Sequence, residues 1–144
     1  MLGAAMLLLL VSCGSDSWGV KESDVPPEAT LAFRGSELRT RGWNPGDKGT
    51  YIDGGSAEYA PRLTLTYDVP PTDPAELLQW YESQLRELDY AVEKDGDPSA
   101  IRVRALLEAT QIADGFDVNF GILGVVHDDG TLTSFTVTVV VRPT

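Results

Sequence analysis

Nucleophilic catalysis needs a Ser, Thr or Cys beside a base, and this sequence offers few bases of the usual kind. The 144-residue chain has one histidine, His127, and one cysteine, Cys13. His127 precedes an Asp-Asp-Gly turn, where an imidazole is usually a solvated surface group. Gly54-Gly55-Ser56 is typical of a flexible turn. The chain contains no Gly-x-Ser-x-Gly elbow, phosphate-binding glycine loop or dinucleotide motif. We therefore predict no catalytic residue and no cofactor.

Metal binding is the next chemistry to consider. One histidine and one cysteine exclude the usual zinc ligand sets. Predicted turns supply four oxygen ligands for calcium, but without the alternating acids and terminal Glu of the twelve-residue calcium loop. These four are Asp95, Asp97, Asp128 and Asp129. We predict no metal site, with calcium binding as an alternative. Because the chain has 22 acidic residues, a carboxylate pair for a small acid-based hydrolase is a second alternative.

Arginines and aromatic residues are mixed in residues 34–59, a turn-rich part of the chain. Arg41 and Trp43 precede the segment Asn44 to Ser56, and Tyr51 lies within it; this segment has one proline and four glycines. Guanidinium groups and aromatic rings favour contacts with proteins or glycans. The alternative is that the rings fill an edge of the core and the arginines balance nearby acids. We predict a partner surface at Arg41, Trp43 and Tyr51, for an envelope protein or a glycan.

The cysteine follows an apolar leader. Met1 to Val11 has no charged side chain, and Met6 to Val11 is continuously apolar. This run suits a secretory signal peptide, whereas a transmembrane helix needs about 20 apolar residues. The leader implies an oxidising compartment, yet a sole cysteine excludes an intramolecular disulfide. Cys13 therefore needs another explanation.

Leu10-Val11-Ser12-Cys13 resembles the lipobox of bacterial lipoproteins. The resemblance covers only the leader. It implies that the leader is cleaved before Cys13, that the Cys13 thiol carries a diacylglyceryl group, and that the new N-terminus carries a fatty acid such as palmitate. Each buried methylene contributes about 0.8 kcal/mol, so several acyl chains would hold the protein stably on the extracytoplasmic side of a membrane.

Acidic residues outnumber basic ones by 22 to 11, which gives a net charge of −11 at pH 7. Nucleic acid and anionic lipid both attract basic patches, so this balance argues against binding either by charge. We predict a signal peptide at 1–12, a lipidated cysteine with a flexible tether at 13–27, and a single domain at 28–144. Trp18 in the tether either docks on the domain or sits at the lipid interface.

Apolar and polar residues alternate in several segments, as they do in half-buried strands. Between two of these segments, Asp128-Asp129-Gly130 predicts a hairpin turn. Residues 101–109 fit a strand better than a second helix, and both remain open. The other predicted strands are Thr30 to Arg34, Glu37 to Trp43, Leu63 to Val69, Phe116 to Ile122 and Phe135 to Val141.

One helix is predicted from Pro74 to about Leu88. Pro70 and Pro71 end the strand before it, Asp73 caps it, and Glu76 bonds back to the cap. An apolar stripe at helical spacing should cover a sheet. The stripe consists of Leu77, Leu78, Tyr81, Leu85 and Leu88.

These elements predict an α+β fold: a two-layer domain with a mainly antiparallel sheet covered on one face by one amphipathic helix. The order of Pro26 to Thr30, the strand at 63–69 and the helix at 73–90 is loosely similar to small exported lipoprotein domains, a similarity that supports the fold. We expect a membrane-anchored envelope lipoprotein with a non-catalytic binding or scaffold domain.

Overall fold

The computed structural model describes residues 18–47, 60–95, 104–113 and 115–144. Within these ranges the chain forms two short 3-10 helices, one α-helix and six strands. In chain order they are η1 (Glu22–Asp24), η2 (Pro27–Thr30), β1 (Glu37–Asn44), β2 (Arg62–Thr72), α2 (Pro74–Glu87), β3 (Ala91–Asp95), β4 (Arg104–Ala113), β5 (Phe116–Val125) and β6 (Leu132–Pro143).

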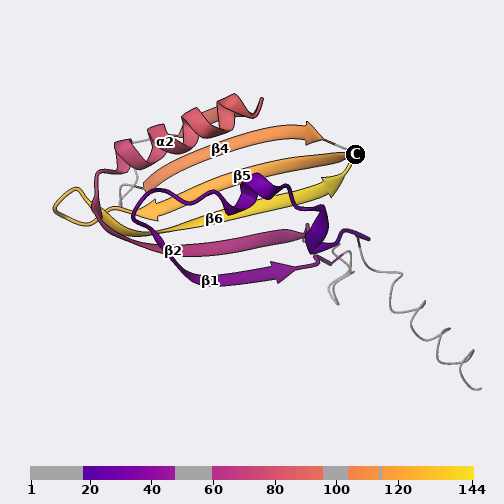
Figure 1. The fold of residues 1–144 in the computed structure, drawn as a ribbon, viewed down its shortest axis with the longest axis horizontal. Coiled ribbons are helices and arrows are strands. Elements are labelled where there is room, and N and C mark those ends of the chain that lie inside the picture. The colour runs from indigo at the N-terminus through magenta and orange to yellow at the C-terminus, as the bar shows by residue number, and fades with distance from the viewer. Residues whose placement is uncertain (1–17, 48–59, 96–103, 114) are drawn as a thin grey trace, which may run out of the picture.

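The six strands form one antiparallel sheet in the order β1-β2-β6-β5-β4-β3. After β2 the chain crosses to the far edge of the sheet by way of α2. The strands β3, β4, β5 and β6 then return as neighbours, until β6 lies between β5 and β2 (Figure 1). The predicted α+β class with an antiparallel sheet is confirmed.

One face of the sheet carries the hydrophobic core. Alternate residues of the central strands point to this face, and those that form the core are at most 6% exposed. On the opposite face, threonines of β2 and β6 are half-buried, and the hydroxyls of Thr66 and Thr136 lie 3.3 Å apart. The core residues of the central strands are Leu63, Leu65, Tyr67, Val69, Val118, Phe120, Ile122, Phe135, Val137, Val139 and Val141.

The helix α2 packs on β3 and β4 at one side of this face. Its N-cap is Asp73, whose carboxylate accepts a hydrogen bond from the Ala75 backbone N at 3.1 Å, as predicted. Two details differ from the prediction. Glu76 pairs with Arg34, because the guanidinium lies within reach of its carboxylate. Leu88 follows the last helical residue and is 38% exposed, so it leaves the apolar stripe.

A left-handed residue ends the helix. Asp89 has a φ of 65°, and its backbone N donates to the Arg86 carbonyl at 3.1 Å. The Tyr90 backbone N reaches back to the Leu85 carbonyl at 3.0 Å. This pair of bonds is the Schellman arrangement, which usually has glycine at the left-handed position. The sharp reversal turns Tyr90 into the core, where it is 3% exposed.

Residues 18–36, which we name the N-terminal strap, cover the rest of the core face (Figure 1). Val20, Ala29 and Phe33 of the strap are buried within the core cluster. The Tyr81 hydroxyl donates to the Leu31 carbonyl at 3.0 Å, and the Phe33 ring meets the Trp80 ring edge to face at 5.6 Å. The sheet is therefore covered by two elements, α2 and the strap.

The strap differs from the sequence interpretation in two places. Sequence composition assigns residues 18–27 to a tether, yet Trp18 packs against the core cluster and its indole Nε1 donates to the Asp47 carbonyl at 3.4 Å. The predicted strand at Thr30 to Arg34 is wrong, because Thr30 is the last residue of η2 and residues 31–34 are not part of a strand. Buried Phe33 explains the apparent alternation there.

The remaining strand predictions are confirmed with changed limits. Strand β2 continues through Pro70 and Pro71 to Thr72, with irregular pairing after Asp68. Both prolines are exposed, so their missing N–H groups interrupt the pairing without ending the strand. Residues 104–109 belong to β4, as the strand interpretation required, and 101–103 lie outside the described residues. Gly130 turns the β5–β6 hairpin with a φ of 84°. Strand β3 has no counterpart among the predicted strands.

Candidate functional site

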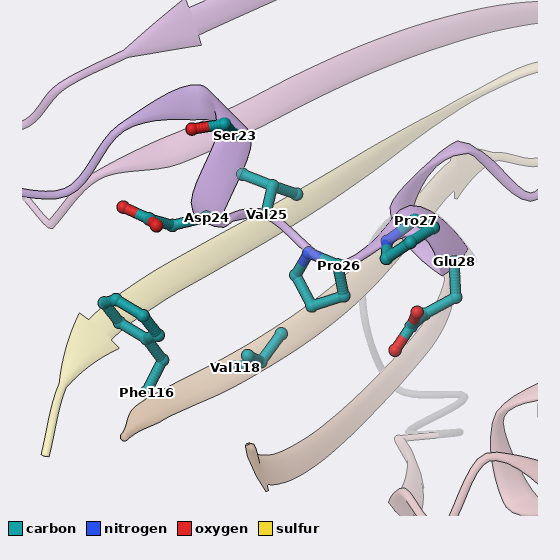
Figure 2. A pocket seen from close by; sticks show the side chains of 8 residues that line it. All are labelled: Ser23, Asp24, Val25, Pro26, Pro27, Glu28, Phe116 and Val118. Atoms are coloured by element: carbon teal, nitrogen blue, oxygen red, sulfur yellow. The ribbon is translucent and has the colours of Figure 1, made fainter. Parts of the chain in front are cut away.

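A hollow of about 330 Å³ lies between the strap and the first residues of β5 (Figure 2). Val118 is buried, while Val25 and Phe116 are half-buried. The volume falls in the range of small-molecule sites. The lining residues are Ser23, Asp24, Val25, Pro26, Pro27, Glu28, Phe116 and Val118.

Two prolines set the backbone of the strap along this hollow. Pro26 has a φ of −59° and an extended ψ of 147°, and Pro27 opens η2 at its first position. A proline ring holds φ near this value, so the chain between η1 and η2 is stiff. Asp24 at the end of η1 and Glu28 at the start of η2 are therefore held on either side of Pro26.

Both carboxylates are oriented by hydrogen bonds. Asp24 accepts from the Lys21 backbone N at 2.8 Å, and Glu28 accepts from the Tyr90 hydroxyl at 3.0 Å. Each bond uses one oxygen, and a carboxylate has a second acceptor oxygen. Burial, followed by the charge of Glu28, raises the pKa of Tyr90 above its ordinary 10.0. The Tyr90 hydroxyl therefore stays protonated and remains a donor to Glu28 at neutral pH.

The two carboxylates lie at opposite ends of the hollow, with Pro26 and Val118 between them (Figure 2). Two negative charges at the ends of an apolar middle fit the binding of an elongated cation.

The predicted partner surface is only partly within the described residues. The Arg41 guanidinium pairs with the Glu22 carboxylate at 3.2 Å, which links β1 to η1. Trp43 is half-buried and packs against the core cluster. Both residues share the core face of the sheet, since their neighbours on β2 are Leu65 and Leu63. Tyr51 lies outside the described residues, so the three-residue surface stays a prediction.

The other candidate side chains are spread over separate elements. His127 is exposed, and its Nε2 lies 3.0 Å from the Thr133 hydroxyl. Asp129 accepts from the backbone N and the hydroxyl of Thr131, and these bonds lower the pKa of Asp129. Asp95 ends β3, while Asp97 lies outside the described residues. Among the residues that the structure describes, no three His, Cys, Asp or Glu side chains gather as metal ligands.

Cys13 and the leader also lie outside the described residues. Within residues 18–47, 60–95, 104–113 and 115–144, no helix has the length and apolar character needed to cross a membrane.

Sequence reasoning missed the hollow because it placed Asp24 in a tether. Polar, proline-rich composition indicates a linker in most chains, and the strap has no helical or strand period. The available signal was the set of apolar residues in this stretch, since Trp18, Val20 and Val25 all pack on the core. The chain matches no protein-family model, no curated protein and no solved structure.

Proposed function

We propose that this chain is an exported lipoprotein, anchored on the extracytoplasmic side of a membrane through a lipid on Cys13, and that its folded domain is a non-catalytic binding module. The observation that carries the anchor is the leader, in which the uncharged apolar run Met6 to Val11 is followed by Ser12 and Cys13. The lipid, including palmitate, supplies the membrane contact, so the acidic domain needs no basic patch.

The hollow supports the binding role. It offers two oriented carboxylates and an apolar centre of Val25, Pro26 and Val118. The alternative function is that of a small acid-based hydrolase, which would need two carboxylates on either side of one bond. Arg41, Trp43 and Tyr51 remain a second proposed contact, for an envelope protein or a glycan.

The strap also limits how far the domain stands from its anchor. The link from Cys13 to the docked Trp18 spans five residues, which reach at most about 18 Å when extended. The proposed lipid therefore keeps the domain beside the bilayer.

Replacing Cys13 tests the anchor. In cells fed labelled palmitate, the parent chain should take up label and sediment with membranes, whereas Cys13→Ser should lose both properties. Ser15→Ala, two residues along the same stretch, is the matched control and should behave as the parent. If Cys13→Ser stays membrane-bound at the same mature mass, the lipoprotein assignment fails.

A further inference from the structure

The charged side chains that line the hollow have one sign. Asp24 and Glu28 are the ionisable residues among the eight that line it, and both are acidic. The side chains between them are hydrocarbon, namely Val25, Pro26 and Val118. A ligand that matches this pattern carries a positive charge at each end and an apolar stem between the charges.

We propose that the hollow binds an aliphatic diamine, in which two ammonium groups are joined by a chain of methylenes. One ammonium donates to the Asp24 carboxylate and the other to the Glu28 carboxylate, as charge-assisted hydrogen bonds. The methylene stem packs against Val118 and Pro26, in the way that a lysine stem covers apolar surface. The half-buried Phe116 ring at the Asp24 end of the hollow adds a cation–π contact.

The site is organised before any ligand arrives. The Lys21 backbone N holds Asp24, the Tyr90 hydroxyl holds Glu28, and Pro26 stiffens the backbone between them. Binding therefore requires little new ordering of side chains, which is the main way in which preorganised sites gain affinity. The net charge of −11 adds a long-range attraction for cations.

Two fixed carboxylates also select for chain length. When one ammonium is bound, the second binds intramolecularly only if the stem spans the distance between the carboxylates. A stem that is too short leaves one carboxylate without its ammonium, and one that is too long must buckle out of the hollow. This inference rests on the binding role proposed above and is independent of the lipid anchor.

The test compares diamines with monoamines. The full chain in a nonionic detergent is titrated by calorimetry with α,ω-diamines of increasing length and with the n-alkylamine of each length. The best diamine should bind about tenfold more tightly than its matched monoamine, should weaken as salt is raised, and should shift the methyl resonances of Val118. Equal affinity for diamine and monoamine, or shifts that leave Val118 unmoved, would overturn the proposal.

Variants distinguish diamine binding in the hollow from nonspecific attraction of cations to the acidic protein. Asp24→Asn and Glu28→Gln should each reduce the diamine to the affinity of the monoamine. The amide introduced by Glu28→Gln keeps an oxygen that can accept from the Tyr90 hydroxyl, so this variant removes the charge and retains the hydrogen bond. Thermal melts confirm that each variant is folded.

The matched control is Glu87→Gln, which removes one negative charge from the exposed end of α2 and should keep the diamine preference. A preference that survives both site variants, or is lost equally in the control, refutes the assignment. Loss of anchoring in Cys13→Ser has no bearing on this outcome.

Discussion

At the scale of single residues, Trp43 separates two interpretations of β1. Its half-buried ring packs against the core cluster, so Trp43→Ala should lower the free energy of unfolding by about 2 kcal/mol, roughly half the loss for a fully buried ring. Urea unfolding measures this, with exposed Thr40→Ala as the control on the same strand. A partner-surface role predicts the reverse, namely lost capture of an envelope protein or glycan with an unchanged melt.

Asp89 offers a stabilising substitution. A non-glycine residue in the left-handed region carries a penalty of roughly 1–2 kcal/mol, and glycine avoids it at a smaller entropic cost. Asp89→Gly should therefore raise the free energy of unfolding by about 0.5–1 kcal/mol. Asp89→Ala keeps the steric penalty and is the control. A glycine variant no more stable than the parent chain would show that Asp89 is unstrained.

At the scale of elements, the strap determines whether residues 18–27 are structural. Val20 is 6% exposed, so removing two of its carbons should destabilise the fold by about 1–2 kcal/mol. Neighbouring Lys21 is exposed, and Lys21→Ala should leave the melt unchanged. Paired thermal melts of Val20→Ala and Lys21→Ala make the comparison. If the two variants melt at the same temperature, residues 18–27 do not stabilise the fold and act as a tether.

The elements that sequence reasoning predicted well are those with a regular period. Alternation in β2, β5 and β6, and the Asp73 cap of α2, each reflect the packing of one face against the core. The strap has no period, because its buried residues are set by where turns direct Val20 and Phe33, and turns depend on distant contacts such as Tyr81 with Leu31. Strand β3 has two apolar residues followed by three charged ones, so it lacks the alternation that indicates a strand.

The candidate site was harder to predict for the same reason. Asp24 and Glu28 become neighbours of Phe116 and Val118 only when the strap crosses β5, across some 90 positions of sequence. Local composition contains no signal for such an approach. The segment Leu10-Val11-Ser12-Cys13, by contrast, is contiguous, so a lipid on Cys13 can be proposed from the sequence without a fold.

At the scale of the whole molecule, buried tyrosines link stability to pH. Burial raises the pKa of Tyr81 above its ordinary 10.0, and burial with the charge of Glu28 does so for Tyr90. The unfolded chain releases these protons near pH 10, while the folded chain retains them. The contribution of the two tyrosines to the free energy of unfolding is therefore fully present below pH 10 and is lost as the pH rises further. Tyrosinate absorbance from both residues should appear together with the loss of circular dichroism. Tyr90→Phe should reduce the loss of stability above pH 10. Ionisation that precedes unfolding would contradict the prediction.

The start of the described chain and the hollow lie at the same end of the sheet, where β6 finishes and β5 begins (Figure 1). If Cys13 carries the proposed lipid, the short link to it would place this end nearest the bilayer. A cation attracted to the membrane surface would meet the hollow there first.

The central place of β6 determines when the sheet can be completed. The strand pairs with β2 on one side and β5 on the other, and residues 70 positions apart, Thr66 and Thr136, meet across the first of these seams. Long-range pairings of this kind form late, because a long loop must close before its contacts can form. Until β6 pairs with both neighbours, β1 and β2 are separate from β3, β4 and β5. If the proposed leader directs export, the chain would cross the membrane before β6 can pair, and the sheet would be completed only after residues 132–143 have crossed.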